Sequence, residues 1–461
     1  MQRKLLFILF SVILVVIILN LGQFYSLWSI DPIALRIARW VAIGFLIWYA
    51  VQRKSLTTWI IISMVVGAEF GEDFPTIAIH LNLISKIFLN LIKTIIAPLI
   101  FATLVVGIAG HSNLKQVGRM GWKSIVYFEI VSTLALFIGL LVINISQAGA
   151  GVTLPINFVQ ETIVAPKLLK WDEVIIHCFP ENIAKSIYDG QILQVVIFSI
   201  IFGIAVALLK ETQRNRMIGF AESLSETMFK FTNIVMYLAP FAVFAAIAFT
   251  VGHMGLGILT NLIKLLGSLY IALTLFILCV FVPIALIIKI PIKKFILAIS
   301  EPATIAFATT SSESALPRAM EAMEKFGVPR KIVAFVMPTG YSFNLDGTTL
   351  YLSLATIFVA QCAGIHLALE QQLVIVFTLM LTSKGVAAVP RASLVVLLGT
   401  AASFGLPTWP IFIILGVDIL MDMARTAVNV IGNSLATVVV ARWEGEFDDE
   451  KAKVFTTKKI D

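Results

Sequence analysis

The residues with the most chemical potential lie near the C-terminus, where polar side chains recur at helical spacing along an apolar segment. Residues 418–433 contain one set of polar positions, and the intervening positions are mostly Ile, Leu, Met, Val and Ala. The polar set consists of Asp418, Asp422, Arg425, Thr426, Asn429 and Asn433. Residues three, four or seven apart share one face of a helix, so the spacing predicts a single polar stripe.

The charges on this stripe suit a particular type of ligand. The planar guanidinium of Arg425 matches a carboxylate through two parallel hydrogen bonds, and Asp422, one turn away, can accept hydrogen bonds from an ammonium. This pair suits a zwitterion with a second carboxylate, which describes an acidic amino acid. The alternative is a buried Asp–Arg pair that only holds helices together. A second polar set, residues 344–348, has no matching cation and favours the ligand interpretation.

Two short segments of small residues precede these polar sets. Residues 311–318 and 383–391 each have apolar sequence on both sides, and each is followed by a span with polar residues, at 344–348 and 422–426. The pattern predicts two hairpins, each followed by an interrupted helix. Paired interrupted segments are typical of transporter binding sites, because unwound backbone at membrane depth must line a cavity or be buried in protein.

Composition identifies the environment in which these elements must lie. Of the 461 residues, 59% are apolar and 13% are charged, about half the ~25% charged residues of a soluble protein. This supplies about a dozen spans of roughly 20 residues each. A soluble enzyme, a disulfide-rich secreted domain and a disordered chain are excluded. The three cysteines are widely spaced, and the five histidines show no metal-ligand spacing.

The distribution of spans and charges predicts four parts. We expect an N-terminal pair of spans (1–54), a set of spans with an extracellular loop at 148–190 (55–288), a part with both hairpins and the polar spans (289–445) and a cytoplasmic tail (446–461). The first apolar stretch lacks a small-residue cleavage site and is interpreted as an uncleaved span. Most Lys and Arg lie in loops on the side of both chain ends, which predicts a multi-pass protein of the plasma (inner) membrane with cytoplasmic termini.

The hairpin at Ser311, Ser312 and Glu313, the segment 344–348 and the segment 422–429 resemble the dicarboxylate/amino acid:cation symporter family, the glutamate/aspartate transporters. The resemblance covers roughly residues 55–445 and is nearest to bacterial proton/glutamate symporters. It implies an all-α fold with eight transmembrane helices and two re-entrant hairpins in inverted repeats, to which this chain adds two spans. It also implies a homotrimer and an elevator mechanism for an acidic amino acid, with no cofactor except a co-transported proton or sodium. In this mechanism residues 289–445 would be the transport core, and residues 55–288 would supply scaffold and trimerisation spans with transport-domain helices interspersed.

The resemblance also implies roles for individual residues. Arg425 would bind the side-chain carboxylate of the substrate, and Asp422 would bind its amino group. Having both residues favours glutamate and aspartate over four-carbon dicarboxylates and neutral amino acids. The other implied substrate contacts are Ser311, Ser312, Thr348, Val389, Thr426 and Asn429.

Departures from the family pattern bear on the coupling ion. Asn433 stands where sodium-coupled members have a carboxylate, and Phe128 and Val131 stand where they have hydroxyls. Because hard cations prefer charged oxygen ligands, this favours proton coupling, with Glu129 and Glu313 as candidate carriers. Sodium remains the alternative, at Gly340, Asn344 and Asn429. The full set of candidate coupling residues is Glu129, Glu313, Gly340, Ser342, Asn344, Asp346 and Asn433.

The family's usual arginine near the pocket is replaced here by Thr310 and Met423, and Arg391 in the second hairpin is a candidate substitute. Two other classes of membrane protein agree less well with this sequence. An anion channel requires rings of repeated polar residues around a shared axis, which one asymmetric Asp–Arg stripe does not provide. A membrane enzyme requires a nucleophile with a base, and Ser311 and Ser312 have no histidine nearby in the sequence.

Overall fold

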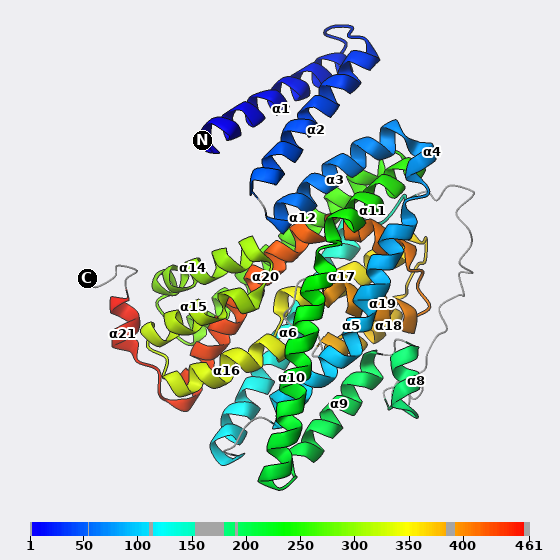
Figure 1. Ribbon diagram of the computed structural model, residues 1–461. Helices are drawn as coiled ribbons and strands as arrows, with labels where there is room; N and C mark the ends of the chain where they lie inside the picture. The colour runs from blue at the N-terminus through cyan, green and yellow to red at the C-terminus, as the bar shows by residue number, and fades with distance from the viewer. Residues whose placement is uncertain are drawn as a thin grey trace. The chain divides into compact units, whose positions relative to one another are not determined.

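The computed structural model describes residues 2–53, 55–109, 114–152, 179–189, 192–383 and 392–455, and these ranges contain helices but no β-strand (Figure 1). The predicted all-α class is confirmed for them. The chain divides into two compact units. The first contains residues 1–88 and 237–256, and the second contains residues 89–236 and 257–461.

The first unit is built around a close pair of helices. Its elements are α1 (Gln2–Phe24), α2 (Pro32–Arg53), α3 (Leu56–Asp73), α4 (Pro75–Ala78), the first turns of α5 (Asn82–Ala109) and α11 (Ala239–Met254). A Cβ on Gly67 or Gly71 of α3 would lie 2.7 Å from a backbone carbonyl oxygen of α11. Glycines four residues apart thus let the two backbones approach closely, as small residues do between membrane helices.

Charged residues join the N-terminal helix pair to α3. Arg36 Nε lies 2.8 Å from Asp73 Oδ2, and Arg39 Nε lies 2.6 Å from Glu69 Oε1. Trp40 Nε1 also donates a hydrogen bond of 2.7 Å to Asp73 Oδ2. The side chains of Glu69 and Asp73 are 16% and 7% exposed, so these charge-assisted bonds are largely shielded from water. Helix α2 is therefore held to α3 by specific polar contacts in addition to apolar packing.

The second unit contains the remaining helices. Those before the predicted hairpins are α6 (Leu114–Ser146), α8 (Ile183–Tyr188), α9 (Ile192–Ala207), α10 (Glu211–Met236), α12 (Ile258–Phe276), the π-helix η1 (Ile277–Phe281) and α13 (Val282–Ile287). Those from the first hairpin onward are α14 (Ile292–Thr309), α15 (Ser312–Lys325), α16 (Arg330–Phe343), α17 (Asp346–Cys362), α18 (Leu369–Thr382), α19 (Ala392–Ser403), α20 (Trp409–Glu444) and α21 (Asp449–Val454).

The first predicted hairpin is present as two helices that pack on each other. Helices α14 and α15 meet at Thr310, whose φ of 53° lies in the left-handed region, and the Ser311 hydroxyl then accepts a hydrogen bond from the Ser314 amide. The next segment is interrupted as predicted. Helix α16 ends at Phe343 and α17 begins at Asp346, so Asn344 and Leu345 lie outside both helices.

The second hairpin is described only along its two arms, α18 and α19. Residues 384–391, including Val389 and Arg391, lie outside the described residues. The predicted interruption at 422–426 is wrong, because α20 runs through it as one helix of 36 residues. Residues 417–431 contain neither Pro nor Gly, and the charged side chains there satisfy one another along the helix. The backbone therefore has no reason to unwind.

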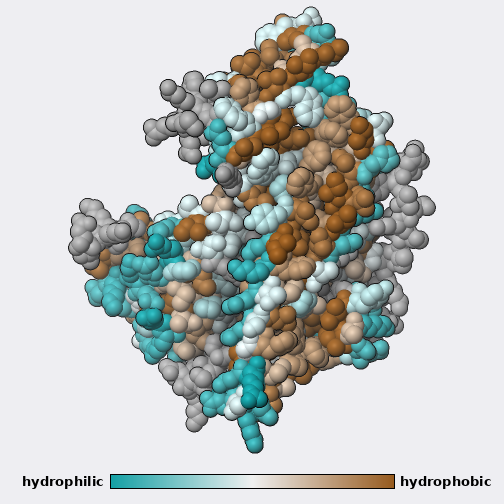
Figure 2. Space-filling view, in the orientation of Figure 1, coloured by the Kyte–Doolittle hydropathy of each residue, from teal (hydrophilic) through white to brown (hydrophobic). Residues whose placement is uncertain are grey.

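Within the described ranges, four helical segments are long and apolar enough to cross a membrane: 32–53, 75–106, 120–146 and 258–287. Helices α10 and α11 add a fifth when they are counted as one broken span. Hydrophobic side chains gather on the visible surface of α1 and α2, whereas hydrophilic ones gather around α21 and the neighbouring hairpin helices (Figure 2). These features fit a multi-pass membrane protein.

The ion pairs of α2 with α3 predict a loss of stability when one partner is removed. Arg39→Ala should lower the free energy of unfolding by about 1.5–3 kcal/mol, because the half-buried carboxylate of Glu69 would lose its charged hydrogen-bond partner. Thermal unfolding in detergent measures this. Arg53→Ala is the matched control, since Arg53 on the same helix is exposed. Equal melting temperatures for the two variants would contradict the anchoring role of Arg39.

Candidate functional site

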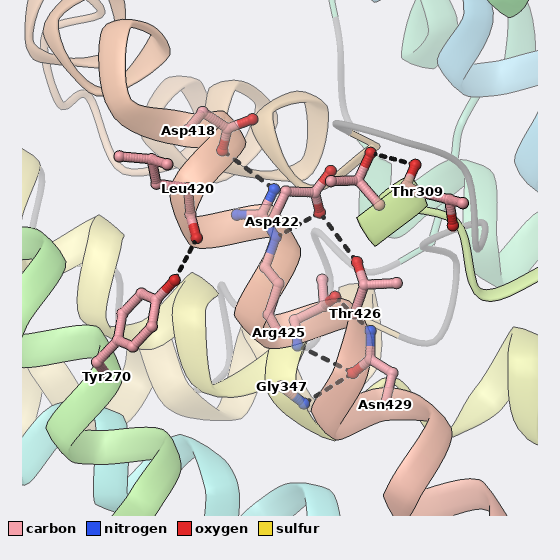
Figure 3. A network of polar contacts seen from close by, with 11 residues as sticks. Tyr270, Thr309, Gly347, Asp418, Leu420, Asp422, Arg425, Thr426 and Asn429 are labelled. Carbon is pink, nitrogen blue, oxygen red and sulfur yellow. Dashed lines mark hydrogen bonds and ion pairs between the residues drawn. The ribbon is translucent and has the colours of Figure 1, made fainter. Parts of the chain in front are cut away.

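The candidate site is centred on Arg425, which is fully buried in α20. Its Nε donates a hydrogen bond of 2.9 Å to Asp422 Oδ1, and its Nη2 donates one of 3.0 Å to Asp418 Oδ1 (Figure 3). All three residues lie on the predicted stripe, so their helical spacing brings the two carboxylates to the same guanidinium. The pairing neutralises Arg425 within its own helix, and the three ionised groups carry a formal charge of −1 together.

Helix α17 completes the environment of the guanidinium. The Arg425 Cζ lies 4.2 Å from the centre of the Tyr351 ring, close enough for a cation–π interaction. Tyr351 is fully buried, as is most of α17. Among the hydrogen bonds of the described residues, Arg425 Nη1 has no partner. The site therefore keeps one buried cationic N–H group that could donate a hydrogen bond to a ligand carboxylate.

Sequence reasoning gave no role to two residues of this site. Asp418 was recognised on the stripe but not as a partner of Arg425, and Tyr351 was not considered. The spacing of Tyr351, three residues after Thr348, would have placed both on one face of α17. The bond between Tyr270 Oη and the Leu420 carbonyl oxygen, 2.9 Å long, further ties α12 to this part of α20 (Figure 3).

The first hairpin approaches the same stretch of α20. Both α14 and α15 pack against α20, and Figure 3 draws Thr309, next to the hairpin tip, on the Asp422 side of the helix. Asp422 Oδ1 also accepts a bond of 3.3 Å from Thr426 Oγ1. At the tip, Ser312 is buried and Ser311 is half-buried. The tip serines thus belong to an element that borders the stripe.

Asn429 has a structural partner in the interrupted segment. Its Oδ1 accepts bonds from the amides of Gly347 (2.8 Å) and Thr348 (3.3 Å), and its Nδ2 donates to Thr348 Oγ1 (3.0 Å). The amide caps the first turn of α17 and fixes it to α20. A Cβ on Gly347 would lie 2.5 Å from the Arg425 carbonyl oxygen, so only glycine fits this contact.

The structure brings four candidate coupling residues together around Asn433, which lies about two helical turns after Arg425 on α20. Asn344, Asp346 and Asn433 are fully buried, and Asn344 Nδ2 donates to Asp346 Oδ2 (3.0 Å) and Asn433 Oδ1 (3.3 Å). A Cβ on Gly340 would lie 2.1 Å from Asn433 Oδ1. A hydrogen-bond partner for Asn344 Oδ1 is absent among the residues that the structure describes. This oxygen could accept a bond from a proton-bearing group or contact a cation.

The other candidate coupling residues have different surroundings. Phe128 of α6 is fully buried, with a ring atom 3.5 Å from the position of a Cβ on Gly340. Glu129, the next residue, is turned by about 100° around the helix axis and is half-buried. The backbones of Glu313 and Ser342 lie in α15 and α16, but the positions of their side chains are not among the described features. Val389 lies outside the described residues.

The predicted sodium ligands do not all have an available oxygen. The Gly340 carbonyl accepts a bond of 2.7 Å from the Asn344 amide, and Asn429 Oδ1 accepts the two α17 amides. Asn344 Oδ1 is thus the one of the three that retains full accepting capacity in this arrangement. A group of three or more His, Cys, Asp or Glu placed to hold a metal ion does not occur in the described ranges.

The profile of the Sodium:dicarboxylate symporter family matches residues 56–443. The chain belongs to this family. It is 42% identical over 402 residues to the "Proton/sodium-glutamate symport protein" of Bacillus caldotenax, covering 86% of this chain and 95% of that protein. It is also 42% identical over 417 residues to the "Proton/glutamate-aspartate symporter" of Escherichia coli K12, covering 87% and 95%.

A third relative, the "C4-dicarboxylate transport protein" of Bacillus subtilis, is 40% identical over 407 residues, covering 87% of this chain and 96% of that protein. The resemblance to symporters is confirmed, and the symporter family consists of transporters rather than enzymes. Residues 1–55, which include the N-terminal helix pair, lie outside the matched family region.

The role of Asp418 as a partner of Arg425 predicts a graded effect of substitution. Asp418→Leu should lower the free energy of unfolding by about 1.5–3 kcal/mol, because it removes a hydrogen bond to a buried charge. Asp418→Asn keeps an acceptor oxygen and should cost less. Thermal unfolding of the purified variants in detergent compares them. Equal losses for Leu and Asn would show that the hydrogen bond itself contributes nothing.

Proposed function

We propose that this chain is a secondary active symporter that takes up glutamate and aspartate, coupled to protons, by an elevator mechanism. The observation that carries the proposal is the buried Arg425, whose Nη1 has no hydrogen-bond partner in the described part of the chain, beside the carboxylate of Asp422. Two relatives named as glutamate and glutamate-aspartate symporters support the same substrate class, and this chain matches 95% of the length of each.

The substrate would complete the charge pattern around Arg425. Its side-chain carboxylate would bind the guanidinium, partly in place of Asp418 and Asp422, and its ammonium would bind the freed oxygens of Asp422. Thr426, Thr348 and Asn429 would add hydrogen bonds, and the tip serines Ser311 and Ser312 would bind the main carboxylate. Val389 and its neighbours would close the outer side as a lid.

Charge balance gives a physical reason for cation coupling. The Arg425 site has a formal charge of −1, and glutamate or aspartate adds another −1 at neutral pH. Moving this charge through a low-dielectric environment is costly unless a cation accompanies it. The energetic cost of carrying an acidic amino acid in this site is therefore lowered when a proton or a metal cation moves in the same step.

The cluster of Asn344, Asp346 and Asn433 is the proposed centre for that cation. Its neutral amides would hold sodium less strongly than carboxylates would, because hard cations prefer anionic oxygens. A single proton on Asp346 would remove the charge of the cluster. Glu129 and Glu313 remain proposed proton carriers, and sodium bound near Gly340, Ser342, Asn344 and Asn429 remains the alternative.

A second candidate substrate class is the C4-dicarboxylates, which the name of one relative favours. Asp422 counts against it, because a dicarboxylate without an ammonium would place a second anion near this carboxylate. An anion channel is a third candidate, from another class of protein. Uptake against a concentration gradient separates a symporter from a channel.

The proposed assembly is the homotrimer that the family resemblance implies, and α10 has a charged face that a neighbouring copy could cover. Glu222, Glu226 and Lys230 are exposed and lie one turn apart on this helix. A charge in hydrocarbon costs at least about 2.5–3.5 kcal/mol, so such a face needs protein or water rather than lipid. A second copy of the chain would cover it.

The proposed architecture places eight spans and two re-entrant hairpins in the plasma (inner) membrane, with both termini in the cytoplasm and the N-terminal pair as additional spans. Residues 289–445 would carry the substrate across, and spans within residues 55–288 would form the scaffold. The extracellular loop would occupy residues 148–190, and the cytoplasmic tail residues 446–461.

Removing the guanidinium tests the substrate assignment. Arg425→Cys should abolish uptake of glutamate and aspartate in proteoliposomes, because the side-chain carboxylate of the substrate would lose its cation. Size-exclusion chromatography should show unchanged assembly. Arg425→Lys keeps a positive charge without the planar fork and should restore only part of the uptake. Uptake by Arg425→Cys at the wild-type rate would contradict the assignment of the substrate.

A gradient experiment tests the coupling ion. An inward proton gradient should accelerate glutamate uptake with sodium absent. Glu129→Gln, Glu313→Gln and Asp346→Asn are compared under the same gradient, and the proton carrier is the residue whose variant retains exchange but loses net uptake. Strict dependence on sodium, with no response to the proton gradient, would contradict proton coupling and leave the substrate assignment standing.

A further inference from the structure

The last described residues of the chain return from α20 to the base of the first hairpin. Phe326, directly after α15, is fully buried. Its ring centre lies 5.7 Å from that of Phe295 in α14, and 5.9 Å from those of Phe447 and Phe455. Four phenylalanines therefore join both arms of the hairpin to both ends of the segment 447–455.

Backbone contacts strengthen this junction. The Asp448 amide donates a bond of 3.0 Å to the Gly327 carbonyl oxygen, and Lys294 Nζ donates one of 3.0 Å to the Phe455 carbonyl oxygen. Gly327 has a φ of +106°, and a Cβ there would lie 2.4 Å from the Asp448 carbonyl oxygen. Glycine is thus required at this position both for its conformation and for the close approach of the tail.

Ion pairs hold the tail at two further points. Lys331 Nζ of α16 lies 2.8 Å from a carboxylate oxygen of Glu446. Arg442 makes two bonds of 2.7 Å to the carboxylate of Asp449, and its guanidinium lies 4.6 Å from the Phe447 ring centre. The bond to Arg442 lowers the pKa of Asp449 below its usual value. This tie is therefore complete at neutral pH and is lost only as the pH falls through that lowered pKa.

We propose that residues 445–455 form a clasp that fixes the base of the first hairpin and so positions its tip beside the Asp422–Arg425 site. The clasp joins the start of α14, the end of α15 and the start of α16, which are the points where the hairpin connects to the rest of the unit. With these points fixed, movement of the hairpin is confined to its tip. The inference rests on the proposed function, in which Ser311 and Ser312 at the tip bind the substrate.

Loss of the clasp has a specific kinetic consequence. A loosened base lets the hairpin adopt arrangements in which its tip is not placed for binding. The apparent affinity falls in proportion to the fraction of molecules that remain competent for binding, so KM rises while kcat changes less. A merely stabilising tail would instead lower the amount of folded protein and leave the KM of the remaining molecules unchanged.

The test compares Phe455→Ala with Val454→Ala in the full-length chain. Phe455 belongs to the phenylalanine cluster, whereas Val454, the adjacent residue, is 71% exposed. Phe455→Ala should accelerate hydrogen exchange of the backbone amides of residues 326–328, which bond to α15, and raise the KM for glutamate uptake several-fold, with kcat changed less. Val454→Ala should match wild type in both measurements.

Unchanged exchange at residues 326–328 in Phe455→Ala, or faster exchange with an unchanged KM, would overturn the proposal. If Phe455→Ala does not fold, Lys294→Met removes only the bond to the Phe455 carbonyl and tests the same expectation. The exchange measurement needs no substrate. A wild-type protein that fails to take up glutamate would therefore contradict the proposed function, while the exchange data would still decide whether the tail fixes the hairpin base.

Discussion

The buried ion pairs of Arg425 with Asp418 and Asp422 are the interaction on which the rest of the site depends. A fully buried guanidinium is tolerable only with anionic partners, and here both come from its own helix. Because these charges pair within one helix, α20 can continue without a break. The remaining contacts of the guanidinium come from neighbouring elements. Tyr351 covers one face of the guanidinium, and the first hairpin borders Asp422. Arg425 Nη1 has no hydrogen-bond partner among the described residues, so a ligand carboxylate could bind the same cation that the two aspartates hold.

In the proposed function, this shared site links recognition to coupling. An acidic amino acid would bind with its ammonium at Asp422 and a carboxylate at Arg425, so both charges of the zwitterion would contribute. The added negative charge then needs a cation nearby. The interrupted segment serves both purposes, because Asn429 fixes the start of α17 beside Arg425 while Asn344 and Asp346, at the break, meet Asn433 of the same α20.

The stripe and the break between α16 and α17 could be predicted because helical spacing and helix-breaking residues are local properties of the sequence. The pairing of Arg425 with Asp418 was also implicit in that spacing, but the choice among possible partners depends on burial. The continuity of α20 was missed, since charged residues in a span suggest an interruption until their mutual pairing is known. The contacts of Tyr351 with Arg425 and of Phe326 with Phe455 join distant parts of the chain, which no local pattern specifies.

The measurement that tests this account most directly is a comparison of glutamate with glutarate, which has the same two carboxylates but no amino group. Binding of both to the purified protein is measured by calorimetry, for the wild type and for Asp422→Asn. The wild type should bind glutamate and discriminate strongly against glutarate, and Asp422→Asn should lose most of this discrimination. Equal binding of the two compounds by the wild type would contradict this account.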